Sequence, residues 1–225
     1  MPNEQSFIVK ILATRFITHD VKQFVLEKPD DYSFIPGHFT DVSINNEKWK
    51  NEERPFTFTS LPEDKVLEFT IKRYHEDEGL TNELHKLKPG DELIIKNPTG
   101  TIEYKGAGTF IAGGGGITPF IAIIRNLAKE NKLEGNTLIF SNKTHDDIIL
   151  ERELKSYLKE NCIFTLTRES KTGYESRKIN EEYLKEKIKD FNQHFYVCGP
   201  SKMVGEIVSA LQKLGANPDF IVIET

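Results

Sequence analysis

The chain has 225 residues, of which 37% are hydrophobic and 29% are charged. This composition is typical of a folded globular protein and excludes a disordered chain or a protein built from long membrane spans. The formal net charge of −5 argues against a nucleic-acid-binding surface. Two cysteines are too few for the usual four-thiolate zinc or iron–sulfur site, so no metal site is expected.

The first residues, MPNEQSFIVK, lack the basic flank and the long apolar stretch of a secretory signal peptide. We therefore expect a cytoplasmic protein with no membrane association, in which Cys162 and Cys198 do not form a disulfide. The histidines show no metal-ligand spacing. We expect them at the surface or in loops, including His38, His75, His85, His145 and His194.

Short alternating runs of apolar and polar residues dominate the chain up to about residue 105. They are FIVKIL, VKQFVLE, HFTDVSI, KVLEFTIKRY and DELIIKNP, and clusters of Pro, Gly, Asp and Asn separate them. Strands at this spacing are typical of an antiparallel β-barrel. One helical stretch, 80–87, interrupts them.

After Gly106 the pattern changes to strands that alternate with helices. Strands are predicted at TFIAGG, TLIFS, CIFTLTR, HFYVCGP and FIVIE, and helices at 119–129, 149–159, 181–189 and 201–214. This alternation predicts a parallel sheet with helices on both faces. We therefore expect two domains, an antiparallel β-barrel over residues 1–105 and an α/β domain over residues 106–225.

The segment GGGGITP, which ends at Pro119, lies between a predicted strand and a predicted helix. Its glycines let the backbone approach a ligand closely, and the free N–H groups of the next helix favour an anion such as a pyrophosphate. The usual dinucleotide fingerprint is not matched, because Thr118 replaces its last glycine and no acidic residue is placed for a ribose. A glycine-rich turn needed only for packing is the alternative.

A second candidate segment, RPFTFTS, begins at Arg54 in the first domain. In a strand, Arg54, Phe56 and Phe58 point one way, and Thr57 and Thr59 point the other. Arginine offers a planar fork for a phosphate, the ring offers a stacking surface, and the hydroxyls offer hydrogen bonds. On this segment alone, an ordinary edge strand is the simpler explanation.

Downstream, the segment EGLTNELHK places Gly79 and Thr81 where a loop meets a helix. We expect Thr81 to cap this helix, and the exposed N–H groups there to offer a second phosphate site. A plain helix cap is the commoner function of such residues.

In their order along the chain, these segments resemble the motifs of the ferredoxin–NADP reductase superfamily, from PGHF to the terminal IVIET. RPFTFTS resembles the family's flavin motif, GLT its flavin-phosphate motif, and GGGGITP and YVCGP its two nicotinamide motifs. The cysteine cluster of members with an attached iron–sulfur domain is missing. The resemblance implies FAD rather than FMN, held where the two domains meet, and a nicotinamide nucleotide.

The resemblance also implies roles for single residues. Arg54 would bind the flavin phosphate, Thr57 would hydrogen-bond near the flavin N5, and Phe56 would pack on the flavin ring in place of the family's tyrosine. Cys198 would lie beside the nicotinamide, near Glu224, so Thr57, Cys198 and Glu224 are the catalytic candidates. The cofactor-binding candidates are Arg54, Pro55, Phe56, Thr57, Lys72, Tyr74, Gly79, Leu80, Thr81, Gly114, Gly115, Gly116, Ile117, Thr118, Pro119, Arg168, Arg177, Cys198, Gly199, Pro200 and Met203.

The segment TRES follows a predicted strand and resembles the family's segment for the NADP 2′-phosphate. Arg168 would pair with that phosphate, assisted by Arg177, which favours NADPH over NADH. Two solvated loop arginines are the alternative. Tyr74 is a candidate to stack on an adenine.

The chain ends IVIET, without the aromatic residue that covers the flavin in many family members. We expect a less covered flavin, or one covered by a partner or a second copy, in a monomer or homodimer. The expected function is electron transfer between NAD(P)H and a small carrier, flavodoxin or ferredoxin. The alternatives are the reductase component of a multicomponent oxygenase, a reductase of free flavin and, from another class, a non-enzymatic binding module.

Overall fold

The computed structural model describes residues 5–74 and 79–224. Its chain forms two compact units, residues 1–100 and 101–225. Each unit has a sheet of its own, and the two sheets are of different kinds.

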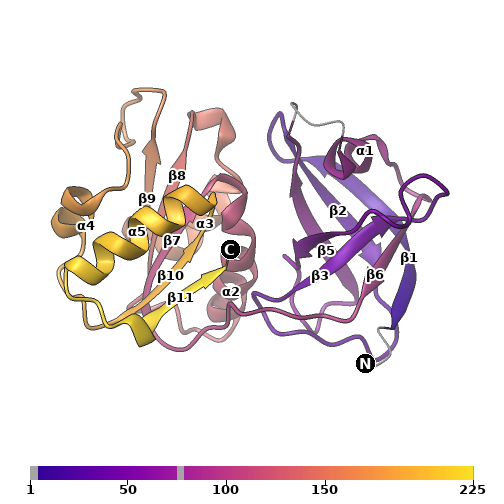
Figure 1. Ribbon diagram of the computed structural model, residues 1–225, viewed down its shortest axis with the longest axis horizontal. Coiled ribbons are helices and arrows are strands. Elements are labelled where there is room, and N and C mark those ends of the chain that lie inside the picture. Colours follow the sequence, from indigo (N-terminus) through magenta and orange to yellow (C-terminus); the bar gives the residue numbers. More distant parts are fainter. Residues whose placement is uncertain (1–4, 75–78, 225) are drawn as a thin grey trace. The chain divides into compact units, whose positions relative to one another are not determined.

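The first unit is a six-stranded sheet in the order β4-β3-β6-β1-β2-β5 (Figure 1). Its strands are β1 Ser6–Phe16, β2 Val21–Glu27, β3 Phe39–Ile44, β4 Arg54–Thr57, β5 Val66–Lys72 and β6 Glu92–Lys96. All neighbouring strands in this order run antiparallel. An isolated β-bridge between Phe58, just after β4, and Phe69 of β5 connects the two outermost strands of this order. The predicted antiparallel barrel is therefore confirmed, as a nearly closed one.

Aromatic rings fill the centre of the first unit. Phe24, Phe58 and Phe69 are fully buried, and the Phe58 ring stacks on Phe34 with centroids 4.3 Å apart. Such offset ring pairs add to the free energy gained by burying their area. This packing anchors the chain just after β4, the strand that begins with Arg54.

The helix α1, Leu80–Lys86, packs into the first unit through Leu80 and Leu84. Its neighbour His85 is also buried, at 7% exposure, so the expectation of a surface or loop histidine is wrong there. The His85 Nε2 donates a hydrogen bond to the Ile71 carbonyl at 2.9 Å. Burial lowers the pKa of His85, so its ring is neutral at pH 7. His75 lies outside the described residues.

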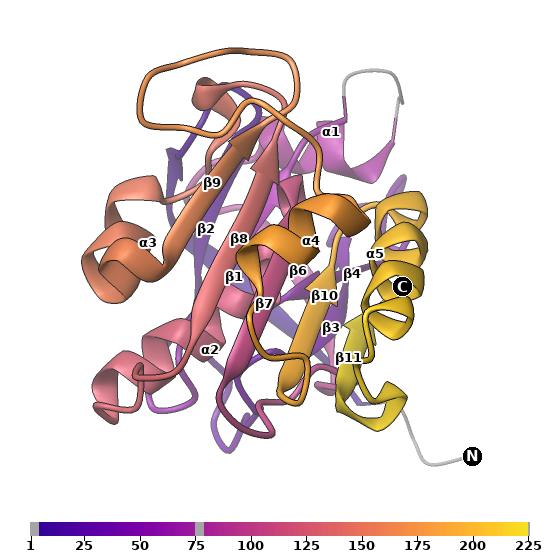
Figure 2. The same cartoon turned by 90° about the vertical axis from the view of Figure 1, so that its left-hand side faces the viewer.

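The second unit is a five-stranded parallel sheet in the order β11-β10-β7-β8-β9 (Figure 2). Its strands are β7 Gly108–Gly113, β8 Thr137–Asn142, β9 Cys162–Leu166, β10 His194–Cys198 and β11 Ile221–Glu224. The first of them, β7, lies in the middle, and the strand order reverses between β7 and β10. In open parallel sheets, ligands bind at the carboxyl ends of the strands at such a switch point.

Helices cover both faces of the parallel sheet, as the sequence predicts. α2 Thr118–Lys129 and α3 Glu151–Leu158 lie on one face, and α4 Glu181–Lys187 and α5 Ser201–Lys213 on the other (Figure 2). Alternate residues of β7 serve the two faces: Phe110 packs on Phe120 of α2, and Ile111 joins the core under α4 and α5. Among the described residues, no helix is long and apolar enough to cross a bilayer.

The segment 101–105 groups with the second unit. The Lys105 and Gly106 N–H groups donate to the Tyr196 hydroxyl at 2.9 and 3.0 Å, and this hydroxyl donates to the Gly106 carbonyl at 2.8 Å. Three hydrogen bonds thus fasten this segment to β10. A domain boundary at residue 105 stays a prediction.

Candidate functional site

The glycine segment after β7 forms a tight turn that leads directly into α2. Gly114–Ile117 is one 3-10 turn, and α2 begins at Thr118, whose Oγ1 donates to the Gly115 carbonyl at 3.1 Å. Gly114 has a φ of +53°, and a Cβ built there would point into open space. The backbone of this turn is therefore accessible to a ligand at the carboxyl end of β7, where helix N–H groups favour an anion.

The YVCGP segment packs against the glycine turn, backbone on backbone. A Cβ on Gly116 would lie 2.5 Å from the Cys198 carbonyl and from the Gly199 nitrogen. A Cβ on Gly113 would lie 2.4 Å from the Met203 sulfur, on α5. The Met203 side chain can move away, but the backbone at Cys198 and Gly199 cannot, so the two segments can meet this closely only because position 116 is glycine. The structure thus brings together both predicted nicotinamide motifs at the switch point of the sheet.

Cys198 and Glu224 are register partners in β10 and β11. The Cys198 thiol is 8% exposed and donates to the Glu224 Oε2 at 3.7 Å. Burial raises the pKa of both the Cys198 thiol and the Glu224 carboxyl. Cys198 therefore stays protonated at neutral pH and is not a nucleophile. The pair offers hydrogen-bonding groups at the carboxyl end of β10.

Replacing Glu224 with glutamine should stabilise the protein more at about pH 7 than at about pH 4. Because the folded pKa of Glu224 lies above its usual 4.5, the folded state binds more protons than the unfolded state, and wild-type stability falls as the pH rises through this range. Glutamine does not titrate, so the gain in Tm should grow with pH. Thermal unfolding measures it, with Glu206→Gln on the exposed side of α5 as control. A gain that shrinks toward pH 7 would contradict the burial argument.

The two arginines predicted to bind the 2′-phosphate differ in whether their side chains already form ion pairs. Arg168 is exposed just after β9, and its backbone N–H donates to the Lys143 carbonyl at 2.8 Å. Arg177 forms ion pairs with Glu186 and with Glu175, the latter at 3.5 Å between Nε and Oε2. Arg168 is therefore accessible to a phosphate. Arg177 is already paired, and its contact with a nucleotide stays a prediction.

In the first unit, β4 carries consecutive flavin candidates. Arg54 is exposed, with Glu52 at 4.0 Å as an ion-pair partner. Phe56 is half-buried and tilted against Phe69, with ring centroids 6.5 Å apart. Thr57 is 9% exposed, and within the described ranges 5–74 and 79–224 its hydroxyl has no hydrogen-bond partner. The strand thus offers a cation, a ring and a hydroxyl.

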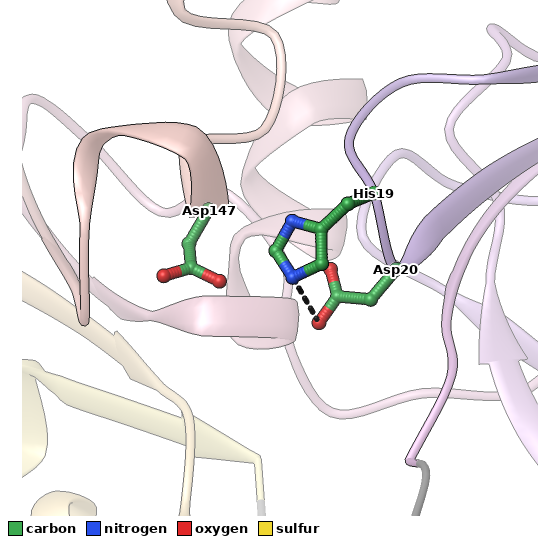
Figure 3. Close-up of side chains that lie close together, drawn as sticks. All are labelled: His19, Asp20 and Asp147. Carbon is green, nitrogen blue, oxygen red and sulfur yellow. Dashed lines mark ion pairs between the residues drawn. The ribbon is translucent and has the colours of Figure 1, made fainter.

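Lys72, the last residue of β5, is oriented by a buried carboxylate. Its Nζ lies 2.6 Å from Asp20 Oδ2, and the His19 Nε2 lies 3.8 Å from the same oxygen (Figure 3). Burial opposes ionisation of Asp20, but the Lys72 hydrogen bond and charge outweigh it and lower its pKa. Asp147, also drawn in Figure 3, accepts hydrogen bonds from Thr144 within the second unit. Lys72 is thus a fixed cation, whose contact with a cofactor stays a prediction.

The GLT turn leads into α1 without a side-chain cap. The N-cap is Gly79, and Leu80 and Thr81 are the first two helical residues. The expectation that Thr81 caps the helix is therefore wrong, because the helix starts two residues earlier than a Thr81 cap requires. The Tyr74 ring is 55% exposed, and its carbonyl accepts from Asn82 Nδ2 at 3.1 Å. Exposure of this ring fits the predicted stacking on an adenine.

Sequence reasoning missed a cavity of about 360 Å³ in the first unit. It is lined by Lys48, Trp49, Arg73, Asn82, Glu83, His85 and Lys86. The Lys48 ammonium lies 4.9 Å from the centre of the Trp49 ring. The residues KWK stand out in the sequence, but the sequence does not show that the loop containing them lies beside α1. The cavity places cations and a large ring beside the predicted flavin-phosphate helix.

Two family models match the chain in succession. The model for the oxidoreductase FAD-binding domain matches residues 9–104, and the model for the oxidoreductase NAD-binding domain matches residues 110–209. The chain belongs to the ferredoxin–NADP reductase-like oxidoreductases. The first unit of this flavoprotein reductase is accordingly its FAD-binding domain and the second its NAD-binding domain.

Curated relatives of the reductase include two proteins named NADH-cytochrome b5 reductase 2. The one from Mycosarcoma maydis is 29% identical over 240 residues, which cover 90% of this chain and 68% of the relative. The one from Mus musculus is 27% identical over 264 residues, which cover 98% of this chain and 95% of the relative. The similarity therefore extends through both domains.

Solved structures share the two-domain fold. A ferredoxin NADP+ reductase from Neisseria gonorrhoeae, with bound FAD and NADP, has a TM-score of 0.85 at 21% identity and covers 97% of this chain and 98% of its own. The FAD/NAD-binding domain of a nitric oxide dioxygenase from Vibrio cholerae O1 biovar El Tor has a TM-score of 0.85 at 22% identity and covers 96% and 97%. At these identities, the similarity establishes the fold.

Proposed function

We propose that this flavoprotein oxidises a reduced nicotinamide nucleotide and passes the electrons singly to a separate, small redox protein. The observation that carries the proposal is the contact of the glycine turn with the Cys198 loop at the switch point, in an NAD-binding domain that directly follows a FAD-binding domain. If these glycines served only packing, the space beside Gly114 would not need to be free, yet a Cβ built there meets no atom within 4 Å.

The described residues fit both nucleotides. The turn at Gly114 and Gly115 leaves the backbone accessible at a helix start, which suits a pyrophosphate. Arg54 is exposed on β4 and carries the charge that a flavin phosphate requires. When bound, FAD supplies a ring that takes up two electrons and releases them one at a time.

Three side chains are proposed to act on the reacting rings. The Thr57 hydroxyl, which has no partner in the described part of the chain, donates to a flavin ring nitrogen. The Cys198 thiol, which burial keeps protonated, and the Glu224 carboxyl, whose pKa burial raises, orient the nicotinamide by hydrogen bonds. These groups orient the two reacting rings and exclude water from them. None of them forms a covalent bond with the substrate.

The proposal also includes the class of protein that accepts the electrons. Two cysteines are too few for a four-thiolate cluster, so we propose an acceptor centre outside the two domains described here. The motifs alone suggest flavodoxin or ferredoxin. The names of the curated relatives favour a small haem protein of the cytochrome b5 kind instead, and we propose this class as the acceptor.

A panel of acceptors tests this choice. The FAD-loaded protein is given NADH or NADPH together with cytochrome b5, ferredoxin, flavodoxin or free FMN, and kcat/KM is measured for each. We expect cytochrome b5 to exceed the other acceptors by at least about tenfold, which corresponds to about 1.4 kcal/mol of transition-state binding. A preference for ferredoxin or flavodoxin would overturn the haem carrier and keep the reductase. Equal rates with free FMN would identify a flavin reductase instead.

A further inference from the structure

The last turn of α1, the helix of the first unit in Figure 1, is held by a buried lysine from β2. Lys22 is 6% exposed, and lysine side chains are rarely buried to this extent. Its Nζ donates to the His85 carbonyl at 3.1 Å and to the Leu87 carbonyl at 2.6 Å. Because the carbonyls at the end of a helix have no partner within the helix, Lys22 supplies their hydrogen bonds from a neighbouring strand.

The His85 side chain fastens the same turn of α1 to β5. Its Nε2 donates to the Ile71 carbonyl at 2.9 Å, which leaves Nδ1 of the neutral ring as an acceptor. Within the described ranges 5–74 and 79–224, this buried Nδ1 has no hydrogen-bond partner. A protonated ring would carry a second N–H at this position with nothing to accept it, so the site fits only the neutral form of His85.

The Lys22 ammonium and the His85 ring lie against the same two aromatic rings. The ammonium lies 5.7 Å from the centre of the Phe16 ring and 5.3 Å from that of the Phe24 ring. The centre of the His85 ring lies 6.0 and 6.3 Å from the same two centres. Arg73, which lines the cavity beside α1 together with His85, adds a second cation. Protonation of His85 would therefore place a third positive charge among apolar rings, where little water screens it.

The acidic groups that face these residues are already engaged. Asp20, just before β2, lies 2.6 Å from the Lys72 ammonium. Asp91, just before β6, faces Lys22 and accepts a backbone N–H at 2.8 Å. On α1 itself, Glu83 lies 2.6 Å from Lys86. Burial, followed by the charges of the neighbouring arginine and lysine, accordingly lowers the pKa of the histidine in this turn.

We propose that Lys22 and His85 form a pH-sensitive latch, which holds α1 on the barrel at neutral pH and releases it in mildly acidic solution. Release exposes the His85 ring to water, where its Nδ1 takes up a proton. The protonated ring does not return to its site, because it would be a buried charge without a partner there. The cavity of about 360 Å³ then loses the wall that α1 contributes to it.

The direction of the pH dependence follows from proton binding. Because the pKa of His85 in the closed state lies below its usual 6.5, the open state binds more protons than the closed state below that pH. The free energy that keeps α1 closed is therefore fully available above the usual pKa and is lost as the pH falls through it. The latch thus opens on the acidic side.

Hydrogen exchange of the backbone amides in the FAD-loaded protein tests the latch. Protection of residues 80–87, corrected for the intrinsic exchange rate, is compared at about pH 7.5 and about pH 5 in the wild type and in His85→Gln. Glutamine keeps an N–H for the Ile71 carbonyl and does not titrate. We expect the wild type to lose protection in α1 at the lower pH while β1 and β6 keep theirs. His85→Gln should protect α1 equally at both pH values.

Two further variants complete the test. Lys22→Met should lower the protection of α1 at both pH values, because two carbonyls lose their donor. His194→Gln is the matched control: this half-buried histidine begins β10 in the second unit, and its Nδ1 also has no partner among residues 5–74 and 79–224. It should leave the pH dependence of α1 as in the wild type.

Three results would overturn the latch. The first is wild-type α1 protection that is equal at both pH values, and the second is a loss at the lower pH that persists in His85→Gln. The third is a loss that includes β1 and β6 to the same extent, which would show unfolding of the whole unit instead of release of α1. Unchanged protection in Lys22→Met would remove Lys22 from the latch and contradict the proposal in that part.

Discussion

Replacing Gly116 with alanine should slow reduction of the flavin by NADH by about a hundredfold or more and leave FAD bound. The new Cβ would lie 2.5 Å from the Cys198 carbonyl and the Gly199 nitrogen. Both are backbone groups that cannot rotate away, so the two nucleotide-binding segments must separate. A misplacement of about 1 Å at a reacting group is enough to cost about a hundredfold in rate.

The matched control for this change is Gly205→Ala. Gly205 lies within α5, and a Cβ there meets nothing within 4 Å. Alanine should stabilise the helix by about 1 kcal/mol and leave flavin reduction unchanged. Stopped-flow absorbance at the flavin band measures the rate in both variants. If Gly116→Ala reduces its flavin as fast as Gly205→Ala, contact between the two segments is not what binds the nucleotide.

Replacing Arg54 with alanine should weaken FAD binding by about tenfold to a hundredfold. A hydrogen bond to a charged group contributes about 1.5–3 kcal/mol. Arg54 is an exposed cation on β4, with an ion pair to Glu52 at 4.0 Å and a hydrogen bond to the Glu53 carbonyl at 2.7 Å. Because that pair is exposed and long, its loss should leave the free energy of unfolding nearly unchanged. The FAD Kd is measured by fluorescence quenching as the apo-protein binds the flavin.

Arg15→Ala is the control for charge alone. Arg15 is exposed on β1 and bonds Gln23 through its Nε, so its removal changes the net charge equally without touching β4. FAD affinity should fall only in the Arg54 variant. An equal, small effect in both variants would show that general charge, and no specific phosphate contact, accounts for the loss.

The elements of both units could be predicted because their apolar residues follow simple periods. Apolar and polar residues that alternate with a period of two located the strands of the first unit. Short apolar runs flanked by helical periodicity located those of the second. Element ends were less exact. α3 begins at Glu151, later than the predicted residue 149, because Leu150 adopts a left-handed conformation with φ +52°.

The parts of the site that escaped prediction depend on residues far apart in the chain. Burial of His85 follows from its packing against β5 through Ile71, and the pairing of Arg177 follows from Glu186 on α4. Likewise, the Glu169 carboxylate accepts from the His145 N–H in the segment after β8 because β8 and β9 are neighbours in the sheet. Motif order along the chain identified the two nucleotide segments, but only the fold shows which side chains complete them.

Anaerobic titration of the FAD-loaded protein with NADH tests whether this protein is a nicotinamide-dependent flavoprotein reductase. We expect the oxidised flavin absorbance to disappear with about one NADH per bound FAD, since NADH donates two electrons and FAD accepts two. A protein that takes up no FAD, or whose bound flavin stays oxidised with excess NADH and NADPH, would contradict the assignment of this chain as a nicotinamide-dependent flavoprotein reductase.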